Sequence, residues 1–531
     1  MTRARAELAR QLFAPVFFAA VLLTVWPLWT PDYLPIEDLP QHLAAVRVLH
    51  SYHDPRFGFE RYFELDLFRT QYLAYYLLAD WLAYLLDLEL GNRLLIIACA
   101  MATPYALRYL LRALGRPEWL ALFALPLTYN AHLILGFINF LMAIPLALFG
   151  LGLAVQQRTR PTLARGCALA VVALGCFFSH VVPFALFVLG CSLIALDRRL
   201  LLVARRSMPL APAGLASLVW LLHSPAGHAT VSAASGGARG PQPIYQSASF
   251  SLHDMPNWLT DTLHGDDDAS VLRGCACVLA LTLLLGVGNA VRSWLRVARR
   301  GNLGTRASSA SPDPNASGTN ALSTTWPLYL RILPLAPLSL WLYFAAPSAY
   351  DWIWPIAQRF PLLAVLFLIP VLPTPPRAAG IVLSCALLGL SFAQERVVTR
   401  AFADFDRDEV GDFDQALAAI PGQQRVLGLI HARGSRNVKF APFIHYVAYY
   451  QARKGGAVMF TFADFPQSPF RFRETNRPPR VPPRWEWLPQ LVQPSDLAWY
   501  QYVLVRGGAA PCAGRCELRY RGSLWSVWKL N

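Results

Sequence analysis

Long apolar runs recur along this sequence and constrain its fold more than any other feature. They reach about 17 to 25 residues, the length at which an α-helix rising 1.5 Å per residue spans a hydrocarbon core of about 30 Å. Hydrophobic residues make up 55% of the chain and charged residues only 15%, a balance that soluble domains rarely show. The sequence therefore predicts a polytopic α-helical membrane protein.

The positive charge of the chain is concentrated between these runs. Lys and Arg outnumber Asp and Glu by 47 to 32, a formal net charge of +15, which could indicate a nucleic-acid partner. The arginines follow the positive-inside pattern instead, so we expect membrane lipids as partners and no nucleic acid. The start, "MTRARAELARQLFAPVFFAAVLLTVWPLW", is basic, then apolar, and lacks an A-x-A cleavage site. We interpret it as a retained signal anchor with a cytoplasmic N-terminus.

Eleven crossings fit the charge pattern if one apolar stretch is left out. A crossing at residues 72–86 would put Arg108, Arg112 and Arg116 on the wrong side of the membrane. We therefore expect 72–86 to lie along the interface as a juxtamembrane helix. Cytoplasmic segments then hold nineteen Lys and Arg, and the short outer segments hold about seven. The expected spans are residues 12–29, 92–115, 118–130, 137–155, 164–180, 183–196, 208–224, 270–290, 326–346, 359–373 and 378–394.

The spacing of the runs predicts two domains. Residues 1–394 should form the transmembrane domain, with a first outer loop at 30–91 and a long outer loop at 225–269. A low-complexity inner linker at 301–325 should be disordered. Because eleven is odd, the polar residues 395–531 should form an extracytoplasmic α/β domain. Its expected strands are "RVLGLIH", "AVMFTF", "YQYVLVR" and "SLWSVWKL", and its expected helices are "FDQALAAIP" and "APFIHYVAYYQARKGG".

The cysteines divide into two groups. Seven of the nine lie in apolar runs, where a thiol acts as a small hydrophobic group. Cys512 and Cys516 form a CxxxC pair in the polar tail. A single pair of this kind is a weak zinc signal, and a disulfide is expected if the tail faces an oxidising compartment.

Polar residues gather at the expected outer face. Stretches such as "TYNAHLILGFINFLMAIP" and "CFFSHVVPFALF" place polar residues at the outer end of an otherwise apolar helix. Because an unpaired polar group in lipid is costly, we expect these side chains to face one shared, water-filled cavity. The residues are Glu37, Asp38, His42, Asn130, His132, Asn139, His180 and Arg359.

The segment "IEDLPQH" at residues 36–42 holds three of these residues, and each allows a structural and a chemical role. Asp38 precedes Pro40, a residue common in the first turn of a helix, so Asp38 either caps that helix or acts as a base. Glu37 suits a supporting role, since neighbouring side chains point in different directions. His42 could orient Asp38 or share a cation with it; otherwise it is a partly exposed helix histidine.

The residues farther along the chain also leave two roles open. His132 and His180 could bind substrate or be satisfied by contacts between helices. Asn130 and Asn139 could bind substrate or hydrogen-bond the neighbouring backbone. Arg359 could grip a phosphate with its guanidinium or extend to the membrane interface.

Aromatic and acidic residues add two weaker signals. Trp352 and Trp354 could stack on sugar faces or belong to the aromatic belt of the interface. The run Asp266–Asp268 could hold a divalent cation, Mg or Mn, or form a solvated turn; no other cofactor is expected. The sequence has no P-loop, G-x-G-x-x-G, H-E-x-x-H or C-x-x-C motif, and no acidic relay within the spans.

The order of these features resembles a known family. A basic N-terminus, one span, an outer loop opening with "PIEDLPQHL", juxtamembrane helices, many spans and an outer C-terminal domain are similar to the GT-C superfamily of membrane glycosyltransferases. Its bacterial aminoarabinose transferases and protein mannosyltransferases are the most similar in architecture. The resemblance implies Asp38 as the acid/base carboxylate, Glu37 as its substitute and Arg359 as a phosphate ligand, with His42 in support of Asp38.

The resemblance also implies a substrate class. The donor would be a sugar on a polyprenyl phosphate or diphosphate, and the acceptor an envelope glycan, lipid or protein at the outer face of the inner (cytoplasmic) membrane. A base near the surface and a cation for the leaving phosphate are what this chemistry needs.

Two other function classes fit the same outer-facing cluster. A transporter or flippase for a lipid-linked or amphipathic substrate could use it as an entry vestibule. Such a protein should also have midplane polar residues or inverted repeats, and the sequence shows neither. A non-catalytic envelope assembly factor would tolerate Asp38→Asn.

Overall fold

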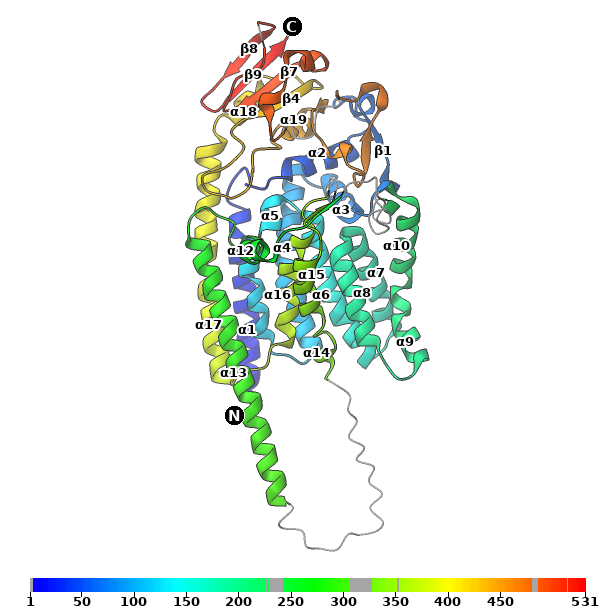
Figure 1. Ribbon diagram of the computed structural model, residues 1–531, viewed down its shortest axis with the longest axis vertical. Coiled ribbons are helices and arrows are strands. Elements are labelled where there is room, and N and C mark those ends of the chain that lie inside the picture. Colours follow the sequence, from blue (N-terminus) through cyan, green and yellow to red (C-terminus); the bar gives the residue numbers. More distant parts are fainter. Residues whose placement is uncertain are drawn as a thin grey trace.

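The computed structural model describes residues 3–225, 227–228, 242–304, 327–350, 353–479, 486–512 and 514–531. A tall body of helices carries a small β-sheet at one end, which we call the sheet end, and the N-terminus lies toward the opposite end (Figure 1). Within these described residues, five helices are long and apolar enough to cross a membrane: Leu88–Ala113, Ile138–Thr159, Asp267–Val297, Leu328–Ala345 and Arg377–Val410. The protein is therefore a multi-pass membrane protein.

Helices occupy each of the regions in which crossings were expected. The run at 118–130 forms two short 3-10 helices, η4 (Glu118–Ala124) and η5 (Pro126–Thr128). The total of eleven crossings stays a prediction, because several of these helices are shorter than a full span. The main helices of the body are α1 (Arg3–Val25), α4 (Leu88–Ala113), α6 (Ile138–Thr159), α7 (Leu163–Ser179), α8 (Val181–Ala195), α10 (Ala211–His223), α13 (Asp267–Gly304), α15 (Leu335–Ala345), α16 (Phe360–Leu368) and α17 (Arg377–Phe405).

Two short helices lie between the body and the sheet (Figure 1). These are α2 (Leu39–His50) and α3 (Leu73–Ala83). At 1.5 Å per residue α3 is only about 16 Å long, too short for a hydrocarbon core of about 30 Å. This length favours the interfacial position expected for residues 72–86.

The two long loops are described in part. In the loop at 225–269, β2 (Pro243–Ile244) pairs with β3 (Ala349–Tyr350), and the short helix α12 (Ala248–Leu259) follows. Residues 226 and 229–241 lie outside the described residues. Of the linker expected at 301–325, the first four residues continue α13, and the rest lies outside the described residues. The remaining short helices are α5 (Ala131–Leu135), α9 (Leu200–Ser207) and α14 (Leu328–Arg331).

The C-terminal region contains a five-stranded sheet with the order β5-β4-β7-β9-β8. Strands β5, β4 and β7 are parallel, and β9 and β8 continue the sheet in antiparallel pairing. Strands expected from sequence are confirmed at β4, β7 and β9, whereas β5 is two residues long and β8 was missed. The bounds are β4 (Arg425–Ile430), β5 (Ala457–Val458), β7 (Tyr502–Arg506), β8 (Cys516–Arg521) and β9 (Trp525–Leu530), with helices α18 (Phe413–Ala418) and α19 (Val447–Lys454).

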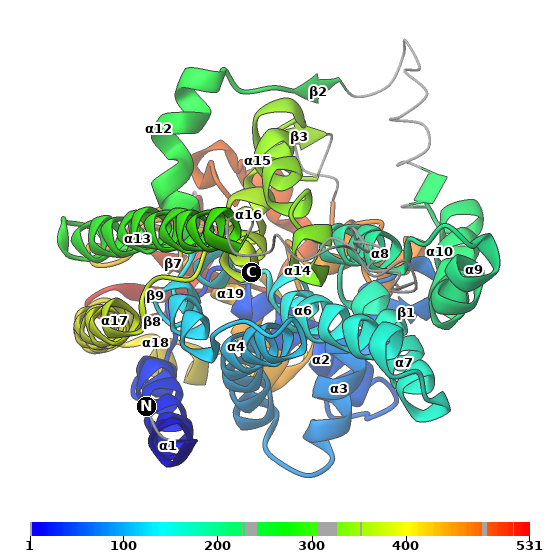
Figure 2. The same cartoon turned by 90° about the horizontal axis from the view of Figure 1, so that it is seen from below.

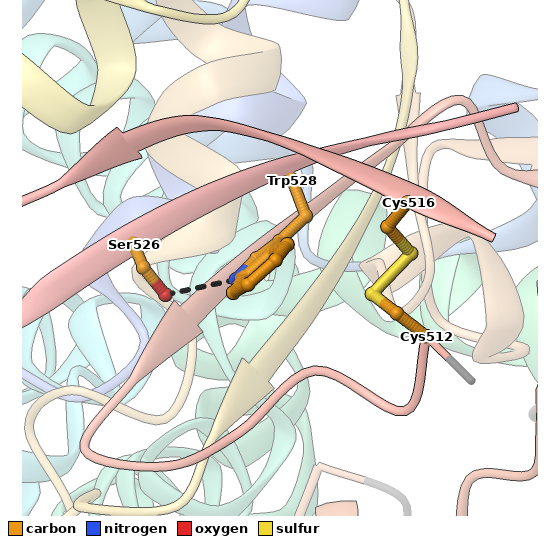
Figure 3. The surroundings of a disulfide bond; sticks show 4 residues. All are labelled: Cys512, Cys516, Ser526 and Trp528. Carbon is orange, nitrogen blue, oxygen red and sulfur yellow. Dashed lines mark hydrogen bonds between the residues drawn. A yellow bond between two sulfur atoms is a disulfide. The ribbon is translucent and has the colours of Figure 1, made fainter. Parts of the chain in front are cut away.

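A disulfide joins Cys512 to Cys516 at the start of β8 (Figure 3), with the two Cα atoms 5.4 Å apart. The bond expected for an oxidising compartment is therefore present. On the neighbouring strand β9, the Trp528 indole Nε1 donates a hydrogen bond to the Ser526 hydroxyl at 3.1 Å (Figure 3).

The C-terminal sheet and the membrane body are connected by a continuous helix and share one apolar core. Helix α17 runs through residue 395, the expected domain boundary, so the two-domain division stays a prediction. One apolar core extends from Leu43 of α2 and Tyr75 of α3 to Val426 of β4 and Trp525 of β9. In addition, β1 (Phe63–Leu65) from the first loop pairs with β6 (Phe470–Phe472). The first loop and the C-terminal region thus fold together.

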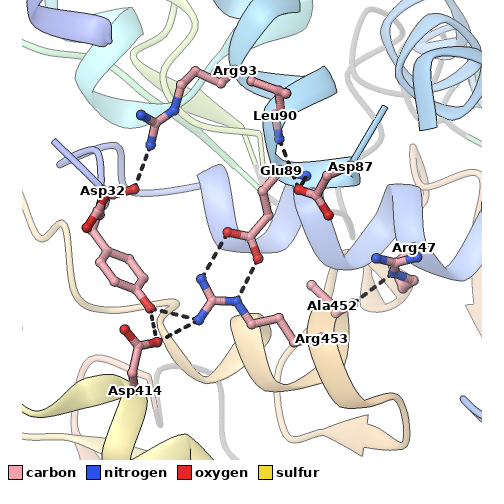
Figure 4. Close-up of polar contacts among 10 residues, drawn as sticks. Asp32, Arg47, Asp87, Glu89, Leu90, Arg93, Asp414, Ala452 and Arg453 are labelled. Carbon is pink, nitrogen blue, oxygen red and sulfur yellow. Dashed lines mark hydrogen bonds and ion pairs between the residues drawn. The ribbon is translucent and has the colours of Figure 1, made fainter. Parts of the chain in front are cut away.

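Arg453 at the end of α19 ties this assembly together (Figure 4). Its guanidinium forms a two-pronged ion pair with Glu89 of α4, at 2.6 and 2.9 Å. Its Nη1 also donates to the Tyr33 hydroxyl at 2.7 Å and to the Asp414 carboxylate at 2.9 Å. One side chain therefore connects the first loop, a membrane helix and α18.

Replacing Arg453 by Gln should lower the stability of the protein. The loss of these charge-assisted contacts costs on the order of 2 kcal/mol, which thermal unfolding of the full chain in detergent would measure. Arg56→Gln is the matched control, because Arg56 is 82% exposed and pairs only locally, with Asp54. Equal losses in both variants would contradict the role given to Arg453.

Candidate functional site

The acidic segment of the first loop is anchored on the turn that ends α5. The Glu37 N–H donates to the Ile134 carbonyl at 2.8 Å, and the Asp38 N–H donates to the Leu135 carbonyl at 3.2 Å. Gly136 follows with φ of +87°, and a Cβ added there would lie 2.8 Å from Asp38 Cβ. Glycine is needed for both the left-handed backbone and the close approach. The position of Asp38 is thus fixed by backbone contacts.

The carboxylate of Asp38 pairs with His445. Its Oδ1 lies 2.9 Å from His445 Nδ1, and both side chains are largely buried. The His445 ring stacks on Phe460, with ring planes 15° apart. Burial lowers the pKa of His445, but the contact with Asp38 and the charges of Asp38 and Glu37 outweigh it, so the pKa rises. The result is a carboxylate paired with an imidazole whose affinity for a proton is raised.

Asp38 does not use its side chain as a helix cap. It occupies the N-cap position of α2, but its side chain accepts no hydrogen bond from the first turn. Of the two roles that the sequence left open, side-chain capping is not observed, and the role as a base stays a prediction.

Glu37 has a different environment. Its Oε2 accepts a hydrogen bond from the Ala441 N–H at 2.9 Å. Burial, followed by the neighbouring Asp38 charge, raises the pKa of Glu37 to about 7. Phe440, the residue before Ala441, has φ of +71°, a strained backbone for a bulky residue that costs of order 1–3 kcal/mol. This strained backbone places the Ala441 N–H within hydrogen-bond distance of Glu37.

His42 lies deeper than expected. It is buried, and its Nε2 lies 2.9 Å from the Gly136 carbonyl while its Nδ1 lies 3.3 Å from the Tyr76 hydroxyl. Burial lowers its pKa to about 4, so the ring is neutral at neutral pH. His42 therefore braces the Gly136 turn, and His445 is the histidine that the fold brings to the Asp38 side chain.

The other predicted histidines belong to an aromatic cluster next to the ends of α5, α7 and α16. The His180 ring lies 5.3 Å from both Tyr72 and Phe140. The His132 ring lies 4.7 Å from Phe140 and 5.6 Å from Trp258. The structure thus brings His132 and His180 together through Phe140.

Trp354 and Arg359 extend this cluster. Trp354 packs on Trp258, with ring centroids 6.0 Å apart, and the Arg359 guanidinium lies 5.6 Å from the Phe137 ring. Arg359 Nε and both ring nitrogens of His132 are buried and have no hydrogen-bond partner within the described residues. The unpaired guanidinium N–H of Arg359 suits an anionic ligand, whereas a neutral imidazole offers one donor and one acceptor. Trp352 lies outside the described residues.

The predicted asparagines have separate roles. The Asn130 side chain caps α5, accepting from the N–H groups of His132 and Leu133 at 3.0 and 3.2 Å. Asn139 Oδ1 is buried and has no partner within the described part of the chain. A narrow, mainly apolar cavity of about 40 Å³ lies among α4, α6 and α16, and Asn130 is the predicted site residue that lines it.

The acidic run at the start of α13 accepts hydrogen bonds from backbone N–H groups. Asp268 is buried, and its Oδ2 accepts from the N–H groups of Thr262 and Leu263 at 2.6 and 2.7 Å. Across the described residues, no three His, Cys, Asp or Glu side chains are grouped so that they could hold a metal ion. The geometry thus favours a structural role for Asp268.

Comparison with solved structures gives a similarity that extends over nearly the whole chain. The sequence matches no protein-family model and no curated protein. The crystal structure of ArnT from Cupriavidus metallidurans in the apo state covers 98% of both chains, with a TM-score of 0.55 and 11% sequence identity. The chain has an ArnT-like fold. The GT-C architecture expected from the sequence is confirmed at the level of the fold.

Gly136→Ala should displace Asp38 and destabilise the ArnT-like fold. Both Gly136 and Gly115 have positive φ, of +87° and +68°, but a Cβ at Gly115 would meet no atom within 4 Å. Gly115→Ala therefore carries only the backbone cost of about 1 kcal/mol, and Gly136→Ala adds the clash with Asp38. Thermal unfolding of the two variants measures the difference; equal shifts would show that the contact with Asp38 is not tight.

The raised pKa of Glu37 predicts a pH-dependent stability. Between its ordinary value of 4.5 and its folded value of about 7, the folded state binds more protons than the unfolded chain. Stability therefore falls as pH rises through this window, and the raised pKa of His445 acts in the same direction.

Glu37→Gln stays neutral and should flatten this slope. Unfolding temperatures measured between about pH 5 and pH 7 would report it. Glu60→Gln is the control, since the Glu60 side chain is 55% exposed. An unchanged slope in Glu37→Gln would show that Glu37 titrates normally.

Proposed function

We propose that this protein is a membrane glycosyltransferase that moves a sugar from a polyprenyl-phosphate or polyprenyl-diphosphate donor to an envelope glycan, lipid or protein. The observation that carries the proposal is the Asp38–His445 pair, 2.9 Å apart, in an ArnT-like fold. The pair joins the first loop, at the start of α2, to the segment of the C-terminal region that leads into α19. The proposal has a lipid-linked donor approach this position from the membrane.

Asp38 would act as the general base. It takes the proton from the acceptor hydroxyl or amine while that atom forms a bond to C1 of the sugar. The bond from C1 to the phosphate oxygen breaks, and the phosphate leaves with the electron pair. His445 holds the carboxylate in position, and Glu37, protonated for part of the time near pH 7, avoids placing a second full charge beside Asp38.

The aromatic cluster would bind the donor. Arg359 carries the positive charge that stabilises the leaving phosphate, and its buried Nε supports this role. His132, His180 and Asn139 offer further polar contacts, and Trp354, whose ring is half exposed, offers an aromatic face for a sugar. The described residues offer no set of three metal ligands, so the proposal assigns the phosphate charge to Arg359.

The proposal places the protein in the inner (cytoplasmic) membrane, with the N-terminus cytoplasmic and the sheet end extracytoplasmic. Two observations support this orientation. The arginines cluster at the segments opposite the sheet end, and the Cys512–Cys516 disulfide suits an oxidising compartment.

Asp38→Asn should abolish transfer. Loss of a general base lowers the rate roughly 100- to 10,000-fold, so a deletion strain complemented with this variant should lack the envelope glycan that wild type restores. His445→Gln should reduce transfer less, because it leaves the base in place.

Glu60→Gln, an exposed change in the same loop, should restore the glycan fully. Equal rescue by wild type and Asp38→Asn would remove the catalytic assignment. It would favour the alternatives, a flippase for a lipid-linked substrate or a non-catalytic assembly factor.

A further inference from the structure

A groove lies between α1 and α17, on the side of the body away from α7, α8 and α10 (Figure 2). Its volume is about 260 Å³. The small side chains Ala19 and Ala20 widen it on the α1 side, and Leu388 and Phe392 form apolar walls on the α17 side. Because both helices belong to the membrane body, lipid chains surround this groove.

The groove has one charged end. Glu395 of α17 lines it and is 8% exposed. Along α17, Glu395 lies about 27 Å from Arg377 at 1.5 Å per residue, close to the thickness of a hydrocarbon core. Directly after α1, the exposed Trp26 and Trp29 occupy positions typical of interfacial tryptophans. The carboxylate therefore lies at the headgroup level of the leaflet nearest the sheet end.

The neighbouring polar groups do not neutralise Glu395. Its hydrogen bond within the described chain comes from the Thr399 hydroxyl at 3.1 Å, and no ion pair to it occurs among the described residues. The groove hydroxyls of Thr24 and Ser391 both donate to carbonyls of their own helices, at 2.8 Å. A carboxylate as buried as that of Glu395 is costly unless a cation accompanies it.

We propose that the groove binds a phospholipid of this leaflet, with one acyl chain between α1 and α17 and a primary ammonium headgroup on Glu395. The apolar walls match the acyl chain, and the buried carboxylate matches an ammonium group that can donate hydrogen bonds. A choline headgroup carries the same charge but donates none, and a glycerol headgroup carries no positive charge. The site is separate from Asp38 and Arg359, so the proposal goes beyond the proposed function.

The test uses the full-length protein in phosphatidylcholine vesicles. Each preparation contains a small fraction of a lipid with a nitroxide on its acyl chain: phosphatidylethanolamine, phosphatidylcholine or phosphatidylglycerol. Electron paramagnetic resonance then measures the motionally restricted fraction. Phosphatidylethanolamine should be favoured about fivefold over the other two, the ratio that a partly exposed ion pair supports.

Two variants test the two parts of the site. Glu395→Gln should remove the preference for phosphatidylethanolamine and leave some restricted lipid, and Ala20→Trp should lower the restricted fraction for all three lipids by filling the groove. Phe18→Trp is the control, because Phe18 is 50% exposed on the same helix and does not line the groove. Equal restriction of the three lipids by wild type, or an unchanged preference in Glu395→Gln, would overturn the proposal.

Discussion

The contact of Glu37 and Asp38 with residues 440–445 is the interaction on which the proposed site depends. Two adjacent carboxylates in a mostly buried position repel each other. The fold gives them different partners: Asp38 faces the His445 imidazole at 2.9 Å, and Glu37 accepts from the Ala441 N–H at 2.9 Å. Burial then raises the pKa of Glu37 to about 7. Because the two environments differ, one carboxylate suits proton abstraction and the other suits a supporting role.

This contact makes the C-terminal region part of the site. His445 and Ala441 lie about 400 positions from Glu37 and Asp38, so their geometry requires the sheet to be fixed on the membrane body. The β1–β6 pairing and the shared apolar core supply that attachment, and Arg453 adds charged contacts to three other elements. A mutation in this attachment should therefore disturb the position of Asp38 without contacting it.

The sequence predicted those helices and strands that a local pattern of apolar residues encodes. Apolar runs located the membrane helices, and alternating or continuous apolar segments located β4, β7 and β9. The run "CELRYR" of β8 lies at the sheet edge and is mostly exposed, so it has no apolar signal. His445 was missed because its function comes from a tertiary contact, and nothing around "FIHYV" marks it. The sequence marked Asn130 and His42 as polar residues in apolar surroundings, but their partners are set by the tertiary fold. Asn130 caps α5, and His42 contacts the Gly136 turn.

Backbone strain connects the two halves of the proposed site. Phe440 has φ of +71°, and the same residue that delivers the Ala441 N–H toward Glu37 places its ring 6.3 Å from Trp258. Trp258 in turn packs on His132 and Trp354. A bulky side chain persists in this backbone conformation only where its surroundings fix it. Here packing on Trp258 on one side and the hydrogen bond of Ala441 to Glu37 on the other do so. Phe440 therefore links the carboxylate pair to the aromatic cluster.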